Sequence, residues 1–263
     1  MANNTVSFYR RLLKTGLKHS FALKGAFFCR IIFMIFNNLM MLLAWSLMFQ
    51  KFNTINGWSF NDFMFMTGLA ISSFSIWPLF FRGTGIYLAR MIENGDLDAY
   101  LLQPRSVLPH IACSVSDPSG FGDLLTGLIL MFVSGLITLQ TAFIVLICFI
   151  CATMCFLAIN ICVSALPFYV KRTSEIGERI FYMFFSISNY PGSIYSGYMK
   201  LIFCTIFPVG IISILPIQLL HHFSWTLFGF LVGFSFFILT FSIFFFYNGL
   251  KHYEGSNRFG VHG

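Results

Sequence analysis

The residues whose types could do chemistry are few, because only nine of the 263 residues are Asp or Glu. Three of them, Glu93, Asp96 and Asp98, precede Tyr100 within residues 91–109. Glycine and proline punctuate this stretch, which predicts a short helix with an acidic side and an apolar tip. Such an element is either a solvated loop or a surface that docks onto another protein.

A second charged segment covers residues 171–179 and holds Glu175, Glu178 and Arg179. It lies between two long uncharged runs. Its acidic residues suit the first turn of a helix, where the macrodipole favours negative charge. The segment is therefore either an ordinary charged helix start or a second contact with a partner.

Amide side chains lie inside the uncharged runs. Asn37 and Asn38 fall near the middle of the first run, and Asn160 and Ser164 fall within a later one. Buried polar groups in a membrane usually form hydrogen bonds between helices. The alternative for Asn37 and Asn38 is a translocation surface that meets the polar groups of a substrate.

Motifs for catalysis or cofactor binding are absent from the sequence. It holds no G-x-x-x-x-G-K-[ST] loop, so the chain does not bind ATP by the P-loop mechanism, and it holds no H-E-x-x-H. We expect no metal and no cofactor on this chain, because the cysteines at 148, 151, 155 and 162 lie near one face of a single predicted helix without His, Asp or Glu beside them. His221 and His222 lie at the predicted outer interface of the membrane, where a structural role is favoured over a proton relay.

The elements that position these residues are set by five uncharged runs of at least 19 residues, at 31–50, 63–81, 124–170, 180–199 and 201–250. A membrane-spanning helix needs about 20 such residues. Hydrophobic residues make up 57% of the chain, charged residues 10%, and the mean hydropathy is +0.81. The chain is thus an integral membrane protein, and its net charge of +7 reflects membrane topology rather than nucleic-acid binding.

The predicted fold is all-α, a single transmembrane domain over residues 1–263. We expect an N-terminal amphipathic helix on the membrane surface over residues 6–19. Pro191, Pro208 and Pro216 interrupt the last apolar runs, which favours a re-entrant segment at about 201–220 that acts as a gate. Six membrane spans are expected, at about 27–49, 63–81, 122–139, 142–167, 177–199 and 225–247.

The distribution of Lys and Arg predicts the orientation. With six spans and both termini inside, 14 of the 16 basic residues are cytoplasmic, and only Lys51 and Lys200 are outside. A seven-span alternative, in which residues 201–220 cross fully, leaves 12 inside and 4 outside. The charges therefore favour six spans without excluding seven.

Four motifs resemble the permease subunits of bacterial type-2 ABC exporters. They are MIENGDLDAYLLQPRSVLP at 91–109, GDLLTGLIL at 122–130, the proline-punctuated stretch at 190–216 and GLKHYEGSN at 249–257. The first is similar to that family's G-x-L-D-x-Y-L-L-x-P loop. Residues 112–121 depart from the pattern, because they lack the basic residue expected before the third span.

The resemblance implies an ATP-driven exporter in the bacterial inner membrane. Two permeases, identical or related, would enclose the pathway, and a separate cytoplasmic ATPase would bind ATP and Mg. It assigns ATPase coupling to the two charged segments and the substrate pathway to Asn37 and Asn38. Two alternatives remain at this point: a membrane-embedded enzyme acting on lipids, and a membrane scaffold without transport activity.

Overall fold

The computed structural model describes residues 2–21, 24–52, 54–55, 57–191 and 208–253. These residues form helices and no β-strand, which confirms the all-α prediction for the described ranges. The elements are α1 (Ala2–Phe21), α2 (Lys24–Phe52), α3 (Phe60–Phe80), α4 (Ile86–Asn94), α5 (Asp98–Leu101), α6 (Val107–Ala112), α7 (Ser119–Val133), α8 (Ala142–Ser164), the 3₁₀ helix η1 (Leu166–Phe168), α9 (Ser174–Ser188), α11 (Val209–Ile212), α12 (Ile214–His221) and α13 (Trp225–Leu250).

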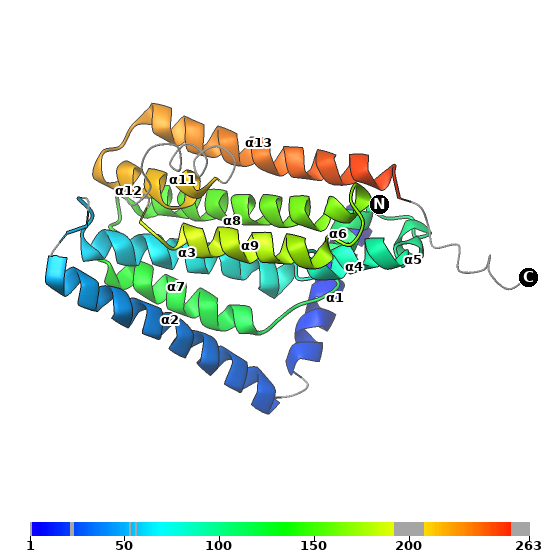
Figure 1. Cartoon of the computed structure of the whole chain (residues 1–263), viewed down its shortest axis with the longest axis horizontal. Helices are drawn as coiled ribbons and strands as arrows, with labels where there is room; N and C mark the ends of the chain where they lie inside the picture. Colours follow the sequence, from blue (N-terminus) through cyan, green and yellow to red (C-terminus); the bar gives the residue numbers. More distant parts are fainter. Residues whose placement is uncertain (1, 22–23, 53, 56, 192–207, 254–263) are drawn as a thin grey trace, which may run out of the picture.

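The long helices run side by side in one bundle (Figure 1), with α3 packed against α7, α8 and α9. Four described helical segments are long and apolar enough to cross a membrane: Phe27–Phe52, Phe60–Phe80, Ala142–Phe168 and Trp225–Leu250. These helices differ sharply in burial. In an apolar stretch of 18 residues, 89% of α3 is buried, but only 6% of α2. Hence α3 forms the centre of the bundle, and α2 exposes most of its apolar surface.

Helices α7 and α9 are shorter, with 15 residues each. At 1.5 Å per residue each covers about 22 Å, less than the roughly 30 Å of a hydrocarbon core. Helix α7 ends at Val133 rather than at the expected residue 139, since Gly135 adopts a left-handed φ of 72°. Residues 192–199 of the expected fifth span lie outside the described residues.

The expected re-entrant segment is described from residue 208 onwards, and residues 201–207 lie outside the described ranges. Its described part consists of the two short helices α11 and α12, which pack against α3 and α8. Pro208 precedes α11, and Pro216 is buried within α12. Pro191 is also buried, shortly after α9.

The backbones of α3 and α7 approach closely at Gly68 and Gly127. A Cβ atom added at Gly68 would lie 2.6 Å from the carbonyl oxygen of Gly127, and one added at Gly127 would lie 2.6 Å from the backbone nitrogen of Ser72. Small residues allow this contact between membrane helices. By contrast, a Cβ added at Gly229 or Gly233 of α13 would meet no described atom within 4 Å.

Helix α1 runs across one end of the bundle, roughly perpendicular to the long helices (Figure 1). The same end holds α4, α5, α6, η1 and the described end of α13, and we call it the α4 end. The opposite end holds α12 and the start of α3, and we call it the α12 end. Lys14 and Lys18 of α1 are exposed, whereas Leu12 and Leu13 are half-buried. This division matches the amphipathic pattern of the sequence.

Candidate functional site

The α4 end joins the two charged segments of the sequence. Glu93, in the last turn of α4, accepts hydrogen bonds from Ser174 at the start of α9, from the backbone nitrogen at 2.9 Å and from the hydroxyl at 2.8 Å. Arg90 and Glu175 also face each other at 3.8 Å, but both are exposed, so this pair adds less than about 1 kcal/mol. The Glu93 contact satisfies an otherwise open N–H of the first turn of α9.

Helix α4 leads into a tight turn that is tied to Tyr253, which lies just after α13. Gly95 takes the left-handed φ of 75° that this turn requires. The next apolar residue, Leu97, is fully buried, and its backbone nitrogen donates to the hydroxyl of Tyr253 at 3.1 Å. Burial raises the pKa of Tyr253 above its usual 10.0.

Beyond this anchored base, α5 projects from the protein. Asp96 and Asp98 are exposed, and so are Leu101 at 41% and Leu102 at 87%. We call the segment from Asp96 to Leu102 the acidic tip. A leucine that is 87% exposed contributes little to the packing of this chain. The acidic tip therefore presents charge and apolar surface together, with its base held by the contacts of Glu93 and Leu97.

Tyr100 does not share the exposure of the acidic tip. Its ring packs edge-on against the buried His110 of α6, with centroids 5.1 Å apart. His110 also meets Phe8 of α1 at 5.2 Å, and the guanidinium of Arg105 lies 3.9 Å over the Phe8 ring. Burial, assisted by the positive charge of Arg105, lowers the pKa of His110 from its usual 6.5. This aromatic cluster joins α1 to the base of the acidic tip.

In the second charged segment, Glu175 and Arg179 are exposed on α9 and Glu178 is half-buried. The exposed pair lies about one helical turn apart on α9, and Glu175 also faces Arg90 of α4 at 3.8 Å. These two side chains are therefore accessible to a partner, together with the neighbouring Ile176, which is 55% exposed.

The two asparagines of α2 have different surroundings. Asn38 is buried, and its amide donates to the carboxylate of Asp123 in α7 at 2.8 Å. Asn37 is exposed on the apolar surface of α2, between Phe33 and Met40. The contact between the middle of α2 and an acidic side chain is not evident from the sequence of α2. The only signal was the presence of Asp123 at the edge of an uncharged run.

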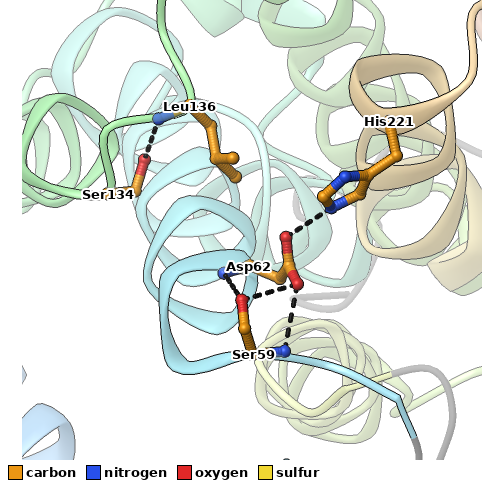
Figure 2. Close-up of polar contacts among 5 residues, drawn as sticks. All are labelled: Ser59, Asp62, Ser134, Leu136 and His221. Atoms are coloured by element: carbon orange, nitrogen blue, oxygen red, sulfur yellow. Dashed lines mark hydrogen bonds and ion pairs between the residues drawn. The ribbon is translucent and has the colours of Figure 1, made fainter.

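At the α12 end, Asp62 connects the start of α3 to α12 (Figure 2). Its carboxylate lies 2.7 Å from Nε2 of His221, and it accepts hydrogen bonds from the hydroxyl and the backbone nitrogen of Ser59. Asp62 is only 7% exposed, whereas His221 is 47% exposed and borders a pocket of about 540 Å³. The structural role expected for His221 is consistent with this contact between two elements.

The order of these groups differs from that of a hydrolase. In a catalytic triad the imidazole lies between serine and carboxylate, and it takes the serine proton. Here the carboxylate of Asp62 lies between Ser59 and His221 (Figure 2). Within the described ranges there is also no group of three or more His, Cys, Asp or Glu residues that could hold a metal ion.

A bundle with four helices long and apolar enough to cross a bilayer defines a multi-pass membrane protein. The sequence matches the family model described as "ABC-2 family transporter protein" over residues 35–257. The chain belongs to this family, which confirms its resemblance to type-2 ABC permeases. It is a membrane component of an ABC transporter. No curated protein and no solved structure matches the chain.

Proposed function

We propose that the chain is the permease subunit of an ATP-driven exporter in the bacterial inner membrane. Two permeases would form the translocation pathway, and ATP and Mg would bind to a separate cytoplasmic ATPase. Members of the family generally act together with such ATPases. The observation that carries the proposal is the acidic tip, which exposes carboxylates and leucines on a base tied to α9 and to the end of α13.

The α4 end is the cytoplasmic end in this proposal, with six spans and both termini inside. Arg82, Arg90 and Arg105 lie in the connections at this end, and so do Lys171 and Arg172. Cytoplasmic loops retain such basic residues. Helices α7 and α9 would take part as the third and fifth spans, and α11 with α12 would form the re-entrant gate.

Coupling would proceed through the acidic tip. When the ATPase closes on its nucleotide, it would push on Asp96, Asp98 and the exposed leucines. Because Glu93 is bonded to Ser174, a displacement of α4 is transmitted directly to the start of α9. Glu175, Glu178 and Arg179 would form the second contact, and Tyr100 would brace the tip from inside.

The pathway face would include α2. An exposed amide in the hydrocarbon core is costly unless it meets protein or water. Asn37 has such an exposed position, whereas the amide of Asn38 is already bonded to Asp123. The second permease or a water-filled pathway would cover the surface of α2 around Asn37. Pro191, Pro208 and Pro216 would shape the gate above it.

Replacing Asp96 and Asp98 with Lys tests the coupling. The charges are exposed, so the spans should fold as before, while ATP hydrolysis by the purified complex should fall to that of the ATPase alone. Two single variants with the same Leu→Asp change form a matched pair. Leu102→Asp, in the acidic tip, should also lower ATP hydrolysis by the complex, whereas Leu139→Asp should leave it unchanged. Leu139 is 97% exposed at the opposite end of the bundle. Full stimulation of the ATPase by the Asp96→Lys, Asp98→Lys variant would overturn the proposal.

A further inference from the structure

A basic pocket of about 520 Å³ opens at the α4 end, where α4, η1 and the end of α13 meet. Lys171, Arg172 and His252 line it, together with Tyr169 and Tyr253. Helices α8 and α13 end at Ser164 and Leu250, so the pocket lies just beyond the ends of two long apolar helices. That is the depth at which lipid headgroups meet a membrane protein, and where tyrosine is enriched.

The charges in this pocket are available to a ligand. The structure shows no carboxylate paired with Lys171 or Arg172 among the described residues. Glu93 also borders the pocket, but Ser174 binds both of its oxygens. Arg172 holds a positive φ of 60°, a conformation that costs energy for any residue with a Cβ and that occurs preferentially at binding sites.

An apolar groove of about 160 Å³ lies next to this pocket. It lies between α8 and α13, which are neighbours in the bundle (Figure 1), and is lined by Cys162, Val163, Leu166, Phe241 and Phe245. The pocket and the groove share a wall. The ring of Tyr169 stacks on that of Phe245 at 4.8 Å, and its hydroxyl donates to the Phe245 carbonyl at 3.1 Å.

We propose that the pocket and the groove together bind one anionic phospholipid. The phosphate lies between Lys171 and Arg172, and an acyl chain lies in the groove between α8 and α13. Basic pockets next to membrane helices recognise anionic headgroups, and each basic residue near such a surface strengthens binding about fivefold. The site depends neither on which side of the membrane the α4 end occupies nor on export.

The test is a titration of the purified full-length chain with phosphatidylglycerol and, separately, with phosphatidylcholine of the same acyl chains, read by native mass spectrometry. Phosphatidylglycerol should bind more tightly. The double variant Lys171→Gln, Arg172→Gln should weaken its binding by about 30-fold and leave phosphatidylcholine unchanged. Lys51→Gln is the matched control, because Lys51 is an exposed lysine at the other end of the bundle.

A second variant tests the groove. Cys162→Trp fills the apolar groove without touching the charges, and should weaken the binding of both lipids. Equal affinity for the two lipids in the native chain, or unchanged phosphatidylglycerol binding in both variants, would overturn the proposal.

Glycerol phosphate, which lacks acyl chains, should not displace the lipid; displacement at equal concentration would identify a soluble-anion site instead. The double variant could instead lose co-purification with the ATPase while it still binds the lipid. That outcome would make the pocket a contact site for the partner protein, and would also contradict the proposal.

Discussion

At the residue scale, two polar pairs join segments that are far apart in the chain. Asn38 and Asp123 are 85 residues apart, and Asp62 and His221 are 159 apart. Asn38 and Asp123 are both buried, so each meets a polar partner where apolar side chains would otherwise surround it, whereas in the second pair only Asp62 is buried. The Asn38–Asp123 contact favours α2 beside α7, because both side chains would be left unsatisfied in another buried arrangement.

Breaking the Asn38–Asp123 bond should destabilise the packing of α2 on α7. In a double-mutant cycle of Asn38→Leu and Asp123→Leu, we expect a coupling energy of about 0.6 kcal/mol, the average for hydrogen bonds between membrane helices, and at most about 1.7 kcal/mol. Unfolding in mixed detergent measures it. The control cycle pairs Asn37→Leu with Asp123→Leu, since Asn37 is exposed and should show no coupling. A coupling energy of zero for the Asn38 cycle would show that this bond contributes nothing to the fold.

At the element scale, α3 and α7 depend on glycine for their contact. Gly68→Ala should destabilise the bundle by about 1–3 kcal/mol, because the added methyl group overlaps the backbone of α7. Gly233→Ala makes the same change in an open position of α13 and should be neutral or slightly stabilising, since alanine favours helix. Thermal unfolding of both variants measures the difference. Equal stability of the two variants would contradict the close approach.

The docking of α1 on α6 should depend on pH through His110. The fold favours the neutral ring, since burial lowers the pKa of His110. His110 therefore contributes its full share to the stability of the fold at pH values above 6.5, the pKa of the unfolded state. This stabilisation is lost as the pH falls below 6.5 and through the lower pKa of the folded state. Hydrogen exchange of residues 107–112, corrected for intrinsic rates, should be faster at about pH 5 than at about pH 7.5. His110→Phe should remove this difference; its persistence would assign it to another group.

Local sequence patterns predicted the elements better than their contacts. The length of a membrane helix is set by the bilayer, so the uncharged runs led directly to α2, α3, α8 and α13. The glycines show the limit of this reasoning. The pair Gly229 and Gly233 has the spacing typical of close packing, yet its surroundings are open within the described chain, whereas the contact is made by Gly68 and Gly127 from two different helices.

At the scale of the whole molecule, the two ends of the bundle should face opposite compartments. Leu139 lies in the connection between α7 and α8, and His252 lies just after α13 at the α4 end. In a background without the native cysteines, Leu139→Cys should react with an impermeant thiol reagent in intact cells. Cysteines placed at His252 or Ser256 should react only after the membrane is permeabilised. Labelling of the Ser256→Cys variant in intact cells would favour seven spans.

The burial of α3 also bears on how the chain enters the membrane. Its mean hydropathy of 1.5 is the lowest of the four long apolar segments, against 2.9 for the segment that contains α8. A helix surrounded by protein is selected for contacts with other helices rather than for its affinity for lipid. Yet α3 leaves the ribosome before α7 and α8, which later enclose it, have been synthesised. The burial of this helix is therefore completed only after α7 and α8, which follow it in the chain, have been synthesised.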